Sequence, residues 1–231
     1  MKISVVIPCF NEIKTINEII KKKEKFLSKF KFEILVIDDF SNDGSREFLK
    51  KISSKNKKIR VLFNDYNQGK GASLNKGFSE AKGEIICIQD ADLEYNPNDL
   101  VPMIELIING HADVVIGSRF RGNGPVRANL FINRVANFFI TTLTNIFTNL
   151  SLTDIECCYK VFKKDDIQKI NLLENRFGIE PELTIKFAKL NLKIFEVGIS
   201  YYGRTKAEGK KIGLIDGFRA IYCIFRYSFF R

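Results

Sequence analysis

The sequence predicts an α/β protein in which a mostly parallel sheet is flanked by helices, and three features of the chain indicate this fold. Short apolar runs alternate with longer segments of helical periodicity between residues 3 and 117. Turn and helix-capping residues separate them, as at residues 41–44 and 96–99. Polar clusters follow the apolar runs, and strands that are joined through helices pair in parallel.

The first half of the chain carries the most regular pattern. Strands are expected at residues 3–7, 33–37, 59–63, 84–89 and 113–117. Helices are expected at 15–29, at 45–52 and from 96 to about 108, and a loop followed by a helix at 69–81. Pro8 stops the first strand because it has no backbone N–H to donate. In the first helix, Ile16, Ile19 and Ile20 share one face while lysines occupy the other.

The second half is less regular. A long, largely apolar helix is expected at residues 127–150, a short strand at 157–162, a helix at 181–190, a strand at 192–197 and a helical tail at 214–231. The longest uncharged run, residues 135–153, is rich in Asn and Thr and is too polar for a membrane span. We expect one domain over residues 1–213 and a C-terminal tail over residues 214–231.

The composition of the chain excludes some classes of protein and favours others. With 45% hydrophobic and 28% charged residues, the chain is neither disordered nor collagen-like. The net charge of +10 favours an anionic partner, such as a phosphorylated substrate, a nucleic acid or an anionic lipid. The five cysteines lack CxxC spacing and indicate buried thiols in a reducing compartment. We expect a cytoplasmic protein without a signal peptide, because the N-terminus runs directly into a strand pattern.

Polar clusters follow four successive predicted strands, and ligands of open parallel sheets bind at that edge. The clusters are Pro8-Cys9-Phe10-Asn11-Glu12, Asp38-Asp39, Asn67-Gln68-Gly69-Lys70-Gly71 and Asp90-Ala91-Asp92. The third cluster lacks the spacing of a P-loop, which excludes an ATPase of that type. In the fourth cluster, residues i and i+2 of an extended segment point the same way, so both carboxylates can reach one cation. Oxygen ligands without His or Cys suit Mg²⁺ or Mn²⁺, and Glu94 is a candidate third ligand.

Together these segments resemble the inverting glycosyltransferases of family 2, which have the Rossmann-like GT-A fold. The resemblance rests on residues 4–8 with Asn11-Glu12, residues 36–39 with Ser41 and Asp43-Gly44, residues 67–71 and residues 90–93. Further segments resemble the dolichol-phosphate mannosyltransferase branch and bacterial polyprenyl-phosphate glycosyltransferases: residues 117–120, 152–160, 180–183, 202–204 and 208–211. The match runs over residues 2–218, nearly the whole chain.

The resemblance implies a nucleotide-sugar donor, GDP-mannose or UDP-glucose, across the first four strand ends. Pro8, Glu12 and Asp39 would contact base and ribose, Lys70 would assist at the donor site, and Asp90 would contact ribose or metal. Asp92 and Glu94 would hold the cation that bridges the diphosphate. Many members carry Gln where this chain has Glu94, so the site here has an additional negative charge.

On the acceptor side, the resemblance implies that Arg119 and Arg134 clamp a polyprenyl phosphate and that Arg204 helps to hold the donor diphosphate. Arg127 and Arg134 are expected to share one helix face, since they are seven residues apart. A phosphate acceptor already carries charge and needs no strong base. A hydroxyl acceptor would need one, for which Asp154 is the first candidate and Glu156 the second. Attack opposite the leaving group converts an α-linked donor into a β-linked product.

The tail interleaves aromatic side chains with Arg219, Arg226 and Arg231, which is typical of an anchor at a membrane surface. Packing of this segment into the core, or against another copy or a membrane-protein partner, is the alternative. We therefore expect a metal-dependent, inverting hexosyltransferase that acts on polyprenyl phosphate at the cytosolic face of the membrane. A hydroxyl acceptor on a glycan, a catalytically inactive homologue and a nucleic-acid-binding module are the other hypotheses. The last is disfavoured because the chain contains no RNA-binding motif.

Overall fold

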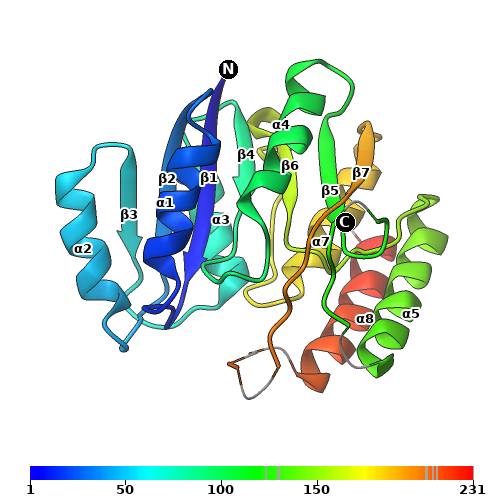
Figure 1. Ribbon diagram of the computed structural model, residues 1–231. Helices are drawn as coiled ribbons and strands as arrows, with labels where there is room; N and C mark the ends of the chain where they lie inside the picture. The colour runs from blue at the N-terminus through cyan, green and yellow to red at the C-terminus, as the bar shows by residue number, and fades with distance from the viewer. Residues whose placement is uncertain (123, 129–130, 206–207, 210, 212, 231) are drawn as a thin grey trace.

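The computed structural model describes residues 1–122, 124–128, 131–205, 208–209, 211 and 213–230. These residues form a seven-stranded sheet in the order β3-β2-β1-β4-β6-β5-β7 (Figure 1). The strands are β1 (Lys2–Cys9), β2 (Lys31–Asp38), β3 (Ile59–Phe63), β4 (Ile85–Ile88), β5 (Val114–Ser118), β6 (Lys160–Lys163) and β7 (Ile194–Gly198). The predicted α/β architecture is confirmed.

Strand direction agrees with the expected, mostly parallel sheet. β1 pairs in parallel with β2 and β4, β2 with β3, and β5 with β7. Among the strands of the described residues, only β6 runs antiparallel, between β4 and β5. The carboxyl ends of β1 to β4 consequently meet at one edge of the sheet, which brings their polar clusters together.

Helices cover the sheet, and Figure 1 shows α1 in front of it and α3 behind it. The helical segments are α1 (Ile16–Phe26), α2 (Ser45–Lys55), α3 (Lys70–Glu80), η1 (Pro97–Asp99), α4 (Leu100–Ile108), α5 (Phe131–Thr148), α6 (Lys164–Ile167), α7 (Ile179–Lys189) and α8 (Leu214–Phe229). Every residue of β4 and β5 is buried, as continuous apolar runs of a covered sheet require. The cysteines are buried and free, as expected.

Two boundaries in the second half differ from the prediction. The helix expected at residues 127–150 is α5, Phe131–Thr148, and Arg127 lies before it. Val126 forms a bridge with Tyr201, and the Arg127 backbone N–H donates to the Tyr201 carbonyl at 2.8 Å. This pairing holds residues 126–127 beside another segment and prevents helical geometry there. The strand expected at residues 157–162 begins only at Lys160.

The C-terminal helix α8 lies beside α5 in Figure 1 and contacts both α5 and α7. Ala220, Cys223, Ile224 and Tyr227 form its buried face. Its opposite face is exposed and aromatic, with Phe218 as one example. Within the described part of the chain, no helix has the length and apolar character needed to cross a membrane.

Candidate active site

A cleft of about 350 Å³ lies where β1 to β4 end. It is lined by Pro8, Cys9, Phe10, Glu12, Asp39, Asn67, Gly69, Lys70, Ser73, Asp90, Ala91, Asp92, Glu94, Tyr95, Arg119, Glu156, Cys158, Arg176, Phe177, Glu180, Tyr201, Arg204 and Lys211. The four polar clusters singled out in the sequence therefore meet in one cavity. Among the predicted site residues, Arg134 and Asp154 are absent from this lining.

Asp39 organises one wall of the cleft through the loop of residues 67–71, here called the donor loop. Its carboxylate accepts hydrogen bonds from the backbone N–H groups of Gln68 and Gly69, both at 2.8 Å. It also accepts a hydrogen bond from Asn64 Nδ2 at 2.8 Å. Gly69 adopts φ +97°, and a Cβ there would lie 2.4 Å from the Asn175 carbonyl oxygen, so this position requires glycine.

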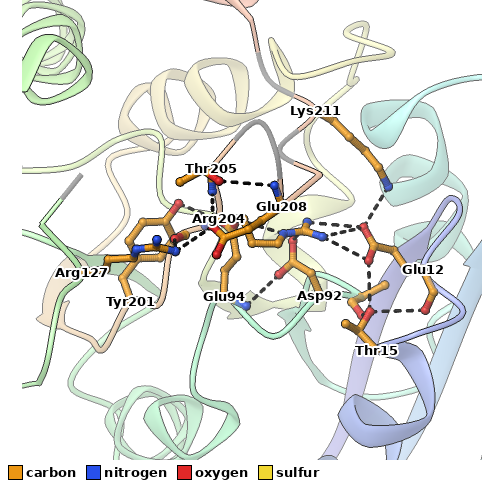
Figure 2. A network of polar contacts seen from close by, with 12 residues as sticks. Glu12, Thr15, Asp92, Glu94, Arg127, Tyr201, Arg204, Thr205, Glu208 and Lys211 are labelled. Atoms are coloured by element: carbon orange, nitrogen blue, oxygen red, sulfur yellow. Dashed lines mark hydrogen bonds and ion pairs between the residues drawn. The ribbon is translucent and has the colours of Figure 1, made fainter. Parts of the chain in front are cut away.

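Arg204 lies within an acidic cluster formed by Glu12, Asp92 and Glu94 (Figure 2). Its Nη2 is 2.5 Å from Asp92 Oδ2, its Nε is 3.1 Å from Glu94 Oε1, and its Nη1 is 3.4 Å from Glu12 Oε2. Lys211 reaches Glu12 Oε1 at 2.8 Å. Arg204 and Lys211 thus lie beside the carboxylates that follow β1 and β4.

Glu94 makes further contacts besides its ion pair with Arg204. It accepts hydrogen bonds from the Tyr201 hydroxyl at 2.9 Å and from the Arg204 backbone N–H at 2.8 Å. These two contacts fix the segment that carries Arg204 against the loop after β4. Glu94 therefore positions Arg204, a role that the sequence prediction of a third metal ligand did not include.

The predicted metal ligands do not converge on one point here, since Asp90 faces Lys70 at 2.9 Å while Asp92 faces Arg204. Within the described residues, no group of three or more Asp, Glu, His or Cys side chains is arranged to hold a metal ion. The chemistry of these side chains nevertheless fits Mg²⁺ or Mn²⁺, because all the candidate ligands are carboxylate oxygens. Burial and the charges of Asp90 and Glu94 raise the pKa of Asp92 to about 7. Metal binding at Asp90, Asp92 and Glu94 stays a prediction.

A chain of alternating charges continues from Asp90 into the protein. Lys70 Nζ lies 2.9 Å from Asp90 Oδ1 and 3.2 Å from Glu180 Oε1. Glu180 also pairs with Lys160, which is fully buried and donates to the Ile155 and Cys157 carbonyls. Sequence analysis assigned no role to Glu180 or Lys160. A charged residue at the start of an apolar strand was the available signal for Lys160.

Arg119 reaches the cleft from the end of β5 and is held by Asp154. Its Nε and Nη2 donate to the two carboxylate oxygens at 2.6 and 2.7 Å, and its backbone N–H donates at 3.0 Å. Asp154 is fully buried and does not line the cleft. The sequence placed Asp154 as candidate base for a hydroxyl acceptor, but here it anchors Arg119, because the guanidinium occupies both of its oxygens.

The two arginines expected on one helix face are separated. Arg134 is exposed on α5, and its guanidinium carbon lies 5.6 Å from the centre of the Phe120 ring. Phe120 directly follows Arg119 in the sequence. Arg127 precedes α5 and pairs with Glu208 at 2.8 Å. The expectation of a shared face is wrong, because the pairing of residues 126–127 with Tyr201 delays the start of the helix.

Glu156, the second candidate base in the sequence prediction, lines the cleft. Its Oε1 is buried and has no hydrogen-bond partner among the described residues. Burial and the charge of Glu180 raise the pKa of Glu156 to about 7. A buried carboxylate oxygen without a hydrogen-bond partner is costly.

The C-terminal helix connects to the donor loop through Glu174. Arg219 donates from Nε and Nη2 to the Glu174 carboxylate at 2.9 and 2.8 Å, and the Tyr227 hydroxyl donates to it at 2.8 Å. The backbone beside Glu174 packs directly on the donor loop, since a Cβ at Gly71 would lie 2.1 Å from the Glu174 carbonyl oxygen. α8 thus supports the donor side of the cleft through two layers of contact.

A largely parallel sheet with this strand order, and acidic side chains gathered at its carboxyl edge, defines the GT-A class of nucleotide-sugar-dependent transferases. The sequence model of glycosyl transferase family 2 matches residues 4–170, and the chain belongs to this family. The resemblance inferred from the motifs is confirmed.

Relatives and solved structures extend this result. The chain is 29% identical over 232 residues to a dolichol-phosphate mannosyltransferase from Pyrococcus furiosus, covering 99% of this chain and 65% of that protein. It is 26% identical over 223 residues to an undecaprenyl-phosphate mannosyltransferase from Micrococcus luteus, covering 94% and 90%. The fold matches glucosyl-3-phosphoglycerate synthase from Mycobacterium tuberculosis, solved with Mn²⁺, UDP and phosphoglyceric acid. That match has a TM-score of 0.76 and 19% identity, over 100% of this chain and 79% of that one.

Proposed function

We propose that this protein transfers a hexose from a nucleoside diphosphate sugar, GDP-mannose or UDP-glucose, to polyprenyl phosphate. The observation that carries the proposal is the acidic cluster with Arg204 inside it, at the edge of the sheet where ligands bind. The P. furiosus and M. luteus relatives are named as polyprenyl-phosphate mannosyltransferases, which supports the acceptor class.

The donor half of the cleft supplies both signs of charge. Asp39 and Glu12 present carboxylate oxygens for ribose and base, beside Pro8 at the end of β1. Lys70 and Arg204 are the cations nearest to Asp90 and Asp92, and they can receive the oxygens of a diphosphate. Asp90 and Asp92 would hold Mg²⁺ or Mn²⁺, which would neutralise charge on the departing nucleoside diphosphate.

The acceptor half is built around Arg119. Its guanidinium is oriented by Asp154 and lines the cleft, so a phosphate oxygen that approaches it is both bound and aligned. Arg134, stacked on the neighbouring Phe120, extends this positive surface outside the cleft. A phosphate oxygen is already charged, so no proton has to be removed before it attacks the anomeric carbon. In-line attack inverts that carbon.

Membrane association follows from the acceptor and from the exposed faces of α5 and α8. These faces carry Phe131, Ile132, Val135, Phe138, Phe139 and Ile146 on α5, and Ile215, Phe218, Tyr222, Phe225 and Phe229 on α8. Arginines accompany them, including Arg134 and Arg226. An apolar face bordered by arginine suits the interface of an anionic bilayer, at which the lipid acceptor resides. We place the protein at the cytosolic surface of the membrane.

Transfer to a glycan hydroxyl is the second candidate. It requires a base in the cleft, and with Asp154 paired to Arg119 the remaining candidate of the two predicted bases is Glu156. Its pKa of about 7 suits a base at neutral pH.

The two candidates are separated by a transfer assay. UDP-glucose or GDP-mannose with a labelled sugar is incubated with Mn²⁺ and either undecaprenyl phosphate or the corresponding alcohol. The proposal predicts label in the organic phase only with the phosphate, and a loss of at least about tenfold in Arg134→Gln. Arg121→Gln, at an exposed arginine whose contact with Glu196 is long at 3.4 Å, is the matched control and should retain activity. Equal transfer to the alcohol, or no transfer to either lipid, would overturn the proposal.

A further inference from the structure

Glu156 lies in the loop between α5 and β6 and lines the cleft. The cationic side chains near it, Arg119 and Lys160, are paired with other residues. The Arg119 guanidinium is paired with both oxygens of Asp154. The buried Lys160 ammonium is taken by Glu180 and by the carbonyls of Ile155 and Cys157. Glu156 Oε1 consequently has no hydrogen-bond donor among the described residues.

Acidic side chains outnumber basic ones along the lining of the cleft. The acidic lining residues are Glu12, Asp39, Asp90, Asp92, Glu94, Glu156 and Glu180, against the basic residues Lys70, Arg119, Arg176, Arg204 and Lys211. A buried carboxylate that lacks a protein partner is stabilised when a ligand donates a hydrogen bond to it. A substrate that donates a hydrogen bond to Glu156 Oε1 would accordingly satisfy this oxygen.

The chemistry of the substrates decides which group meets Glu156. The diphosphate and the acceptor phosphate are anions, so they go to Lys70, Arg204 and Arg119 and are repelled by Glu156. Ribose and base are assigned to Asp39, Glu12 and Pro8, so the part that remains is the transferred sugar, whose hydroxyls are uncharged hydrogen-bond donors. We propose that Glu156 is a specificity-determining residue that accepts a hydrogen bond from a hydroxyl of the transferred sugar and excludes sugars that bear a carboxylate.

This inference rests on the proposed function and names its substrate class as neutral sugars. A uronic acid would place its carboxylate in a wall that already contains Glu156 and Glu180. Two like charges at short range in a cavity are strongly unfavourable. Discrimination against uronates therefore arises from repulsion, whereas preference for the neutral hexose arises from the hydrogen bond.

Titration calorimetry of donors tests the inference without requiring turnover. UDP, UDP-glucose and UDP-glucuronate are compared in the presence of Mn²⁺, together with GDP, GDP-mannose and GDP-mannuronate. The wild type is expected to bind the neutral sugar at least about tenfold more tightly than the matching uronate. Glu156→Gln, which keeps size and removes charge, is expected to reduce that ratio by about tenfold and to leave the Kd of the free nucleotide within about twofold. Glu105→Gln, on the surface of α4, is the control and should change none of these values.

Thermal unfolding of the same variants completes the experiment. Because Glu156→Gln removes an unpaired buried charge, its Tm should equal or exceed that of the wild type. An unchanged sugar ratio, or an equal loss of affinity for free nucleotide, overturns the inference and leaves the proposed function standing. A lowered Tm with a proportional loss of all binding assigns Glu156 a structural role and also overturns it. If no nucleotide or nucleotide sugar binds the wild type, both the inference and the proposed function fail.

Discussion

The pairing of Asp154 with Arg119 leads to the most sharply defined prediction. Asp154 is fully buried and accepts three hydrogen bonds from Arg119, at 2.6, 2.7 and 3.0 Å. Asp154→Asn keeps the shape of the side chain but removes its charge and one acceptor. Arg119→Met keeps much of the apolar stem and removes the guanidinium. The two variants and their combination form a double-mutant cycle.

The expected magnitudes follow from burial. Removing one member of a buried ion pair costs about 3–5 kcal/mol, because the other charge stays behind without a partner. We expect each single variant to lose about 3 kcal/mol of unfolding free energy. The double variant has no orphaned charge, so it should lose less than the sum of the singles, with a coupling energy of about 2 kcal/mol or more.

Urea unfolding of the four proteins at one fixed pH measures these energies. Arg121→Met serves as the matched control, since Arg121 is exposed and its contact with Glu196 is long at 3.4 Å. It should cost less than about 0.5 kcal/mol. Losses in the Asp154 and Arg119 variants that add within about 0.5 kcal/mol would refute the anchoring role. Unchanged stability of Asp154→Asn with lost turnover would instead return Asp154 to the role of base.

Three further predictions concern the core, the donor loop and the helical surface. Burial lowers the pKa of Lys23 from 10.5 to about 7. Above pH 7 the unfolded chain therefore binds more protons than the folded chain, so the free energy of unfolding rises with pH, by up to about 1.4 kcal/mol per pH unit. Lys23→Met should raise the Tm at pH 7 and flatten the rise between pH 7 and 8.5. Gly71→Ala should destabilise the protein by about 1–3 kcal/mol and weaken nucleotide binding, because its Cβ would collide with the Glu174 carbonyl, as calorimetry and urea unfolding can measure. Replacing Phe138 and Phe218 by Ser should lower co-sedimentation with phosphatidylglycerol vesicles by roughly tenfold or more.

Matched variants control each of these experiments. Lys22→Met changes an exposed lysine on the same helix as Lys23 and should leave the pH dependence of stability intact. Gly217→Ala, with open space around the added methyl group, should not destabilise. Tyr66→Ser removes an exposed aromatic ring away from α5 and α8 and should not alter vesicle binding. If a test variant behaves like its control, the corresponding argument is wrong.

The part of the cleft at the ends of β1 to β4 could be anticipated from the sequence because it depends on local order. Each polar cluster directly follows a strand, and parallel pairing brings strand ends to one edge without further information. Asp39, Asp90 and Asp92 accordingly line the cleft as expected. The positions of β1 to β4 required only the period of the apolar residues.

The part of the cleft around Arg119 depends on contacts between distant segments, which no local pattern records. Arg119 and Asp154 are 35 residues apart, and their pairing follows from how the loop after α5 returns to the sheet. The start of α5 is set by the bridge between Val126 and Tyr201, which overrode the helical pattern around Arg127. The unpaired state of Glu156 likewise became visible only once the partners of its neighbours were known.

Calorimetry of donor binding tests whether the acidic strand ends form a metal-dependent site for a nucleotide sugar. Calorimetric titration of UDP-glucose and GDP-mannose is carried out on the wild type and on Asp92→Asn, each with Mn²⁺ and with a chelator. Saturable binding of one donor to the wild type with Mn²⁺, weakened at least about tenfold by the chelator and by Asp92→Asn, is the predicted result. Equal affinity in all four titrations of each donor, or no binding in any of them, would contradict a donor site at the acidic strand ends.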